Sequence, residues 1–150
     1  MTSNCKNGLV TRLQTGFYTV WTSDGEVTCR LRGRFKKETA DWDICVVGDK
    51  VSISLLDDGS GVIESIEERE KVFVRMAPSA RGVTRQVMLA NPDQVVLVFA
   101  CADPFPSLRM LDRFLVIAES QQIPAVILAN KYDLVSPEQA KATFGIYETL

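Results

Sequence analysis

The sequence of 150 residues contains no histidine and only four cysteines, Cys5, Cys29, Cys45 and Cys101. No two of these form a C-x-x-C pair, which argues against a zinc site within the chain, because structural zinc requires closely spaced thiolate or imidazole ligands. Cys29 and Cys101 lie in apolar runs. We therefore expect these two thiols to be reduced core residues of a cytosolic protein.

The chain also lacks a long hydrophobic run. The longest one, 95–102, is too short to cross a bilayer, and the N-terminus has no apolar core of the signal-peptide kind. We expect a cytoplasmic protein with no membrane partner. Hydrophobic residues make up 46% of the chain and charged residues 24%, which is typical of a folded protein and not of a disordered one.

Neither sign of charge is in large excess, since the formal net charge is −2. The distribution is uneven, however. Residues 1–37 hold seven Lys and Arg against two acids, and residues 38–70 hold ten acids against two bases. A nearly neutral total therefore hides a basic N-terminal part that is followed by an acidic one.

Residues 8–67 show the alternating pattern of short, half-buried strands. Val27, Cys29 and Leu31, for example, alternate with Thr and Arg side chains. The hairpin signals are Asp24-Gly25 and Asp58-Gly59. We predict strands at 8–14, 17–22, 26–33, 49–56 and 61–67. Five short strands predict a β-barrel of OB type over residues 1–70, although an SH3-like barrel fits the same pattern.

The pattern of residues 71–150 is that of an α/β domain. We interpret 71–91 as a linker and first strand. The apolar runs Gln94–Ala100 and Ala125–Ala129 predict strands that are covered on both faces. A helix between them is predicted by Ser107 as N-cap and by leucine and alanine at helical spacing, namely Leu108, Leu111, Leu115 and Ala118. Strand, helix and strand in this order predict a parallel sheet. Ser136-Pro137-Glu138-Gln139 then starts another helix with a capping box.

The sharpest chemical signal is Asn130-Lys131-Tyr132-Asp133, directly after the second apolar run. Ligands of such sheets bind beyond the carboxyl ends of the strands. A carboxylate such as Asp133 accepts two hydrogen bonds from guanine, from N1–H and from the amino group. Asn130 suits the acceptor edge of a purine or a bond within the loop, and the Lys131 stem suits the face of the base. Alternatively, Asn130 and Asp133 only shape a turn.

No phosphate-binding loop of the form G-x-x-x-x-G-K-[ST] accompanies this tetrapeptide, because none of the nine glycines is followed by lysine. In ordinary GTPases that loop precedes the guanine motif. A permuted order would place the loop after Asp133, where 17 residues are too few for it. We therefore expect a fragment of a longer protein, truncated before the phosphate-binding loop, with no catalytic residue in the fragment.

A barrel followed by a GTPase domain that starts with its N-K-x-D segment resembles the circularly permuted, ribosome small-subunit-dependent GTPases of the RsgA/YjeQ family. The stretches that carry the resemblance are Cys29-Arg30-Leu31-Arg32-Gly33-Arg34-Phe35-Lys36, Val47-Gly48-Asp49-Lys50-Val51, Ala90-Asn91-Pro92-Asp93-Gln94-Val95, Leu111-Asp112-Arg113-Phe114-Leu115 and Asn130-Lys131-Tyr132-Asp133-Leu134. They occur in the family's order from residue 29 to residue 134, so the resemblance covers nearly the whole chain.

The resemblance implies a GTPase that acts in late maturation of the small (30S) ribosomal subunit, with GTP or GDP, Mg²⁺ and, in a C-terminal segment, Zn²⁺. It implies a barrel that contacts 16S rRNA and an intact protein that is monomeric. GTP hydrolysis by these 150 residues alone is not expected. Two alternatives remain open at this stage, namely a non-enzymatic OB-type RNA-binding module and a different GTPase with an unrelated barrel.

Basic residues on and after one barrel strand are candidates for RNA contact. They are Arg30, Arg32, Arg34, Lys36 and Lys37. Tyr18 and Trp21 are candidate stacking surfaces for bases. The alternative is a solvated basic face, with Phe17 and Trp21 in the core. Trp42, in the acidic loop, fits a packing role better than a stacking role.

Overall fold

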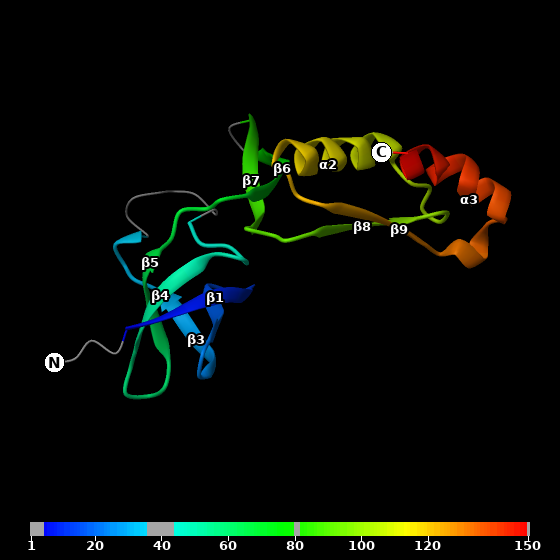
Figure 1. The fold of residues 1–150 in the computed structure, drawn as a ribbon. Helices are drawn as coiled ribbons and strands as arrows, with labels where there is room; N and C mark the ends of the chain where they lie inside the picture. Colours follow the sequence, from blue (N-terminus) through cyan, green and yellow to red (C-terminus); the bar gives the residue numbers. More distant parts are fainter. Residues whose placement is uncertain (1–4, 36–43, 80–81, 150) are drawn as a thin grey trace. The chain divides into compact units, whose positions relative to one another are not determined.

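The computed structural model describes residues 5–35, 44–79 and 82–149. The chain divides into two compact units, Met1–Pro92 and Asp93–Leu150. The first unit contains the strands β1 (Cys5–Gln14), β2 (Phe17–Thr22), β3 (Gly25–Leu31), β4 (Lys50–Leu55), β5 (Gly61–Ile66), β6 (Val72–Ser79) and β7 (Gly82–Ala90). In Figure 1 these strands run from blue to green. Lys36, Lys37 and Trp42 lie outside the described residues.

Strands β1 to β5 form a closed barrel in the order β1-β2-β3-β5-β4. All neighbours are antiparallel except β3 and β5, whose parallel pairing closes the barrel. The five strands stand close to the predicted positions, and the closed five-stranded barrel confirms the OB-type prediction. β1 pairs with both β2 and β4, because it is long enough to bend across the barrel.

The barrel core consists of side chains that point inward at every second position of the strands. Val10, Val20, Ile53 and Ile63 are fully buried there. Cys29 belongs to the same core, as predicted, and burial raises the pKa of its thiol to about 11. The thiol therefore stays protonated at neutral pH, as expected of a packing residue.

A buried ion pair fixes the segment that leads into β4. The fully buried carboxylate of Asp49 accepts hydrogen bonds from Arg69 Nε at 2.7 Å and Arg69 Nη2 at 2.9 Å. It also accepts a bond of 2.7 Å from the Val46 backbone N–H. Arg69 donates in addition to the Ile44 carbonyl oxygen at 3.3 Å. The carboxylate therefore joins the start of β4 to the segment between β5 and β6.

Strands β6 and β7 pair antiparallel over their whole length, from Val72↔Ala90 to Ser79↔Gly82. Residues 71–91 are therefore a β-hairpin, and the prediction of a linker followed by a single strand was wrong. Pro78 and Gly82 suggested a break, but a proline is tolerated in a two-stranded hairpin because each strand has one unpaired edge.

The base of this hairpin is attached to the loop before β4. The Asn91 side chain donates to the Gly48 carbonyl oxygen at 3.2 Å and accepts from the Glu70 backbone N–H at 2.8 Å. The Ala90 backbone N–H donates to the Val47 carbonyl oxygen at 2.9 Å. Gly48 has a φ of +91°, and a Cβ at this position would lie 1.8 Å from the Ala90 carbonyl oxygen. Only glycine fits this contact.

The second unit contains β8 (Val95–Ala100), α2 (Leu108–Ser120), β9 (Ala125–Asn130), η1 (Tyr132–Leu134), α3 (Pro137–Phe144) and η2 (Gly145–Thr149). β8 and β9 pair in parallel, which confirms the predicted β-α-β unit. Helix α2 runs beside this sheet, as Figure 1 shows. It buries Leu111 and Ala118 from the predicted set. Ser107 precedes the helix as predicted, but its side chain makes no capping hydrogen bond.

The sheet of the second unit is covered on one face. Val95, Leu97 and Phe99 of β8 are buried, whereas Val96 and Val98 between them are exposed. In β9, Val126 and Leu128 lie beside them in register and are exposed as well. The prediction that both strands are covered on both faces was therefore wrong for the described residues, because α2 packs on one side only. No helix among the described residues is long and apolar enough to span a membrane.

Candidate functional site

The carboxyl ends of β8 and β9 lie next to each other. Ala100 is the register partner of Asn130, and the Cys101 backbone N–H donates to the Asn130 carbonyl oxygen at 2.8 Å. The loops that follow the two strands therefore start at the same edge of the sheet. This edge is the place where parallel α/β sheets bind their ligands.

Two residues at this edge shape the turn after β9. Lys131 adopts the left-handed conformation, with φ 56° and ψ 40°. The Asn130 side-chain oxygen accepts a hydrogen bond of 2.8 Å from the Lys131 backbone N–H, which supports this conformation. The Lys131 ammonium donates to the Asp103 carbonyl oxygen in the loop after β8. The lysine stem therefore crosses from one loop to the other.

Tyr132 and Asp133 follow in the short helix η1, and both are exposed. Among the described residues, the Asp133 carboxylate has no hydrogen-bond or ion-pair partner. Helix α3 then starts with the predicted capping box. The Ser136 hydroxyl accepts from the Gln139 N–H at 3.3 Å, and the Gln139 side chain accepts from the Ser136 N–H at 2.9 Å. The four predicted nucleotide-binding residues are thus brought together at the sheet edge, with the carboxylate open to solvent.

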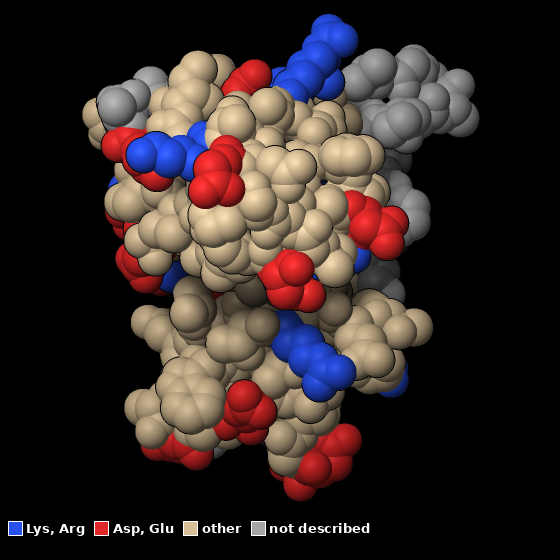
Figure 2. Space-filling model, turned by 90° about the vertical axis from the view of Figure 1, so that its right-hand side faces the viewer, with Lys and Arg blue, Asp and Glu red and all other residues tan. Residues whose placement is uncertain are grey.

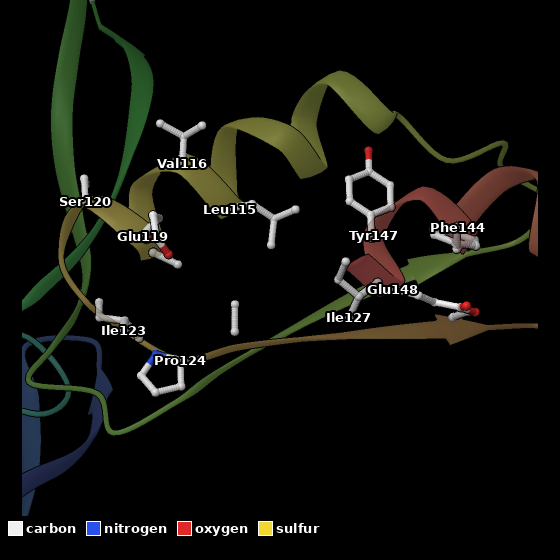
Figure 3. A pocket seen from close by; sticks show the side chains of 13 residues that line it. Leu115, Val116, Glu119, Ser120, Ile123, Pro124, Ile127, Phe144, Tyr147 and Glu148 are labelled. Atoms are coloured by element: carbon white, nitrogen blue, oxygen red, sulfur yellow. The ribbon is translucent and has the colours of Figure 1, made fainter. Parts of the chain in front are cut away.

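The second unit also has a cavity of about 990 Å³ between α2, β9 and η2. Figure 3 shows its lining, which is mostly apolar and includes Leu115, Ile127 and Phe144. Tyr147 lines it too, and its hydroxyl donates to the Asp112 carboxylate at 2.6 Å, which raises the pKa of Tyr147 to about 12. Residues 130–133 do not line this cavity. It is therefore an apolar space on the covered side of the sheet and separate from the candidate nucleotide residues.

Comparison with known protein families decides which family has this combination of barrel and sheet. The model of the RsgA GTPase matches residues 66–150, and the model of the RsgA N-terminal domain matches residues 7–63. The chain belongs to the RsgA GTPase family. Membership confirms the resemblance inferred from the sequence and disfavours the reading as an unrelated RNA-binding module.

Curated RsgA proteins from several bacteria are similar to the chain. The small ribosomal subunit biogenesis GTPase RsgA of Carboxydothermus hydrogenoformans is 41% identical over 135 residues, which are 89% of this chain and 42% of that protein. The protein of the same name from Gemmatimonas aurantiaca is 41% identical over 141 residues, which are 92% of this chain and 46% of that protein. The chain therefore spans somewhat less than half the length of these RsgA relatives.

Solved structures of the RsgA type have the same fold. YjeQ from Thermotoga maritima matches with a TM-score of 0.64 and 29% identity, over 96% of this chain and 48% of that chain. YloQ, described as a circularly permuted GTPase, matches with a TM-score of 0.60 and 29% identity, over 97% of this chain and 47% of that chain. These matches confirm the predicted fold class, a barrel followed by the first part of a permuted GTPase domain.

The basic residues predicted for RNA contact have different surroundings in this RsgA family member. The Arg30 guanidinium carbon lies 4.4 Å from the centre of the Phe17 ring. Arg32 Nε pairs with a Glu64 carboxylate oxygen at 3.0 Å, and Arg34 donates to the Glu64 carbonyl oxygen. Arg30 is therefore stacked on an aromatic ring, whereas Arg32 and Arg34 converge on one acidic residue. On the face that Figure 2 shows, the described Lys and Arg side chains lie singly among Asp and Glu side chains.

The aromatic residues of β2 are arranged differently from the prediction. Tyr18 is 7% exposed and part of the barrel core, so it offers no stacking surface. Phe17 is 41% exposed and Trp21 56%, so the alternative that put both of them in the core was wrong. Residues 17 and 21 share one face of the strand, and residue 18 belongs to the other. The burial of Val20, two positions from Tyr18, shows that this face of β2 points inward.

Proposed function

We propose that the chain is the N-terminal part of a GTP-binding, GTP-hydrolysing factor for late maturation of the small ribosomal subunit. The observation that carries this proposal is the position of Asn130-Lys131-Tyr132-Asp133 at the carboxyl end of β9 in a member of the RsgA GTPase family. The names of the relatives, small ribosomal subunit biogenesis GTPases, support the proposed activity and partner. We place the protein in the cytoplasm, where ribosomal subunits mature.

In this proposal Asp133 recognises guanine. An exposed carboxylate without a partner among the described residues is suited to accept the two neighbouring donors of the base. The Asn130 side-chain oxygen is engaged within the turn, which leaves its amide N–H group for the acceptor edge of the purine. The Lys131 stem, held across the rim by its contact with the Asp103 carbonyl, would lie against the ring. Tyr132 belongs to the same turn and completes the proposed nucleotide-binding segment.

We expect the Mg²⁺ and Zn²⁺ sites in parts of the intact protein other than these 150 residues. The described residues contain no group of three or more His, Cys, Asp or Glu side chains that suits a metal ion. When bound, Mg²⁺ would neutralise charge on the transferred phosphoryl group during attack by water. We keep Mg²⁺ and the expected Zn²⁺ of the C-terminal segment as proposals for the intact protein, and we expect no turnover of GTP by these 150 residues.

The barrel is proposed to contact 16S rRNA of the 30S subunit through Arg30, Arg32 and Arg34, together with Lys36 and Lys37 outside the described residues. We further propose that residues 1–70 form the RNA-binding domain, that 71–150 begin the GTPase domain and that the intact protein is a monomer. Support for this division comes from the two family models, which meet between residues 63 and 66. By contacts alone, the hairpin up to Pro92 groups with the barrel.

Replacement of Asp133 by Asn in the intact protein tests guanine recognition. The amide offers one acceptor and one donor in place of two acceptors, so the affinity for GDP is expected to fall about 100-fold or more. The affinity for XDP, whose base carries a carbonyl where guanine has the amino group, should rise. Asp93→Asn, the same chemical change before β8 at the opposite edge of the sheet, is the matched control. Unchanged preference for GDP over XDP in equilibrium titrations would refute the role of Asp133.

Replacement of Arg30, Arg32 and Arg34 together tests the RNA contact. Each lost phosphate contact should lower the slope of log affinity against log salt concentration by about 1, and binding to purified small subunits should weaken. Lys6→Ala provides the control, because Lys6 pairs with Asp24 on the surface of the same barrel. A salt slope that stays the same in the triple variant would exclude these arginines from phosphate contact.

A further inference from the structure

The outer surface of the barrel carries an aromatic platform, which we define as Phe17 and Trp21 of β2. The two residues are four positions apart on one strand, so their rings project on the same side with Cα atoms about 13 Å apart. Both side chains are substantially exposed, in contrast to Val20 and Tyr18 on the inward face of the same strand. Large aromatic side chains that share one exposed sheet face are typical of binding surfaces.

Cations flank the platform. The Arg30 guanidinium carbon lies over the Phe17 ring, 4.4 Å from its centre, which is a cation–π contact. A guanidinium can stack on a nucleobase as well. Arg12 on β1 is the register partner of Thr19, which lies between Phe17 and Trp21 along β2. Among the described residues, neither arginine has a carboxylate partner. The surface therefore combines two flat apolar rings with two cations that are available to phosphate groups.

The charge around Trp21 is different. Its register partner on β3 is the exposed acid Glu26, and its partner on β1 is Leu9. A phosphate group close to Trp21 would be repelled by Glu26, whereas an uncharged base would not. The polar groups of the surface therefore favour a ligand with flat rings at Phe17 and Trp21 and with its negative charges beside Arg12 and Arg30.

We propose that the Phe17–Trp21 platform binds unpaired nucleobases of single-stranded RNA by stacking, with Arg12 and Arg30 holding the adjoining phosphates. The inference rests on the proposed RNA contact of the barrel and gives that contact a specific chemistry. A base-paired helix hides the faces of its bases, so the platform discriminates in favour of loops, bulges or strand ends. The proposed RNA-binding surface then includes β2 in addition to the basic residues on and after β3.

The test uses the 150-residue chain and three fluorescently labelled probes, namely single-stranded oligoadenylate, an abasic oligomer with the same number of phosphates and an RNA duplex. We expect oligoadenylate to bind more tightly than both other probes. Trp21→Ala and Phe17→Ala should each weaken binding of oligoadenylate about 5- to 150-fold, the range measured for loss of one base–aromatic stack. Both variants should leave binding of the abasic oligomer unchanged.

Two further variants act as controls. Leu56→Ala removes a similarly exposed apolar side chain elsewhere on the barrel and should not change the affinity for oligoadenylate. Trp21→Phe keeps a ring and should retain most of it. In a Trp42→Phe background Trp21 is the sole tryptophan, so stacking should quench its fluorescence on addition of oligoadenylate and not of the abasic oligomer. Thermal unfolding of each variant checks that the barrel is intact.

Three results would overturn the inference. The first is equal affinity of the parent chain for oligoadenylate and the abasic oligomer. The second is unchanged binding of oligoadenylate by Trp21→Ala and Phe17→Ala. The third is loss of small-subunit binding by these variants with undiminished binding of oligoadenylate, which would assign the platform to a ribosomal protein. If oligoadenylate behaves as expected but the intact protein does not cosediment with small subunits, the proposed function fails and the stacking site stands.

Discussion

Removal of the Asp49 carboxylate is expected to be the most damaging single change to the barrel unit. Asp49 is fully buried and accepts three hydrogen bonds, two from Arg69 and one from the Val46 N–H. In Asp49→Ala the Arg69 guanidinium, itself largely buried, loses the carboxylate that compensates its charge. Loss of one partner of a buried ion pair costs about 3–5 kcal/mol. This is a large fraction of the roughly 5–15 kcal/mol that stabilises a typical domain.

Equilibrium unfolding in urea, followed by tryptophan fluorescence, measures this loss. Both tryptophans, Trp21 and Trp42, belong to the first unit, so the signal reports on the unit that contains Asp49. Asp24→Ala is the control, because it removes an exposed carboxylate that pairs with Lys6 on the surface. A surface pair of this kind contributes little to stability, because solvent screens both charges.

A second substitution separates the ion pair from a general packing defect. Arg69→Met removes the charge that Asp49→Ala separates from its buried carboxylate. The double variant should therefore be clearly more stable than the sum of the two single losses predicts. The reasoning would be refuted if Asp49→Ala cost no more than Asp24→Ala, or if the two losses at Asp49 and Arg69 were simply additive.

Two further predictions concern the same unit. Gly48→Ala should lower the free energy of unfolding by more than about 2 kcal/mol, because the new Cβ would meet the Ala90 carbonyl; Gly59→Ala, also at positive φ but in open space, should cost only about 1 kcal/mol. Burial raises the pKa of Tyr18 to about 12 from its usual 10.0, so its neutral form stabilises the barrel below pH 10. As the pH rises from 10 to 12, the parent should lose about 2–3 kcal/mol more stability than Tyr18→Phe, in which only the other buried groups, such as the Cys29 thiol, still titrate.

The barrel was predictable because its strands carry a local signal. The alternation of Val27, Cys29 and Leu31 with polar residues appears directly as the inward and outward faces of β3. The hairpin β6–β7 was not predictable in the same way. Pro78 and Gly82 resemble a break in the chain, and only the pairing of β6 with β7 accommodates them within strands. We predicted that β8 and β9 are covered on both faces, whereas one face is covered, because an apolar run does not reveal how many helices pack on a strand.

The candidate site also has features that the sequence predicts and features that it does not predict. The position of Asp133 follows from sequence, since a short polar segment after an apolar strand must lie at the strand's carboxyl end. The contact of Lys131 with the Asp103 carbonyl does not, because it joins residues that are 28 positions apart. For Phe17 and Trp21 the difficulty was to decide which face of β2 points into the barrel. Both faces of β2 carry large apolar residues, so composition alone cannot tell which one packs inward, and a shift by one position reverses the assignment.

The closed barrel and the open two-stranded sheet of the second unit offer a partner different kinds of backbone contact. Every described strand of the barrel has two neighbouring strands, so unpaired backbone is confined to strand ends that extend past a neighbour, such as 25–28 of β3, which pair with β2 alone. Recognition on most of the barrel must therefore use side chains and loops. In the described part of the second unit, β8 and β9 pair only with each other, and each offers an open edge to another strand. Further polypeptide can extend that sheet by main-chain hydrogen bonds, whatever its sequence.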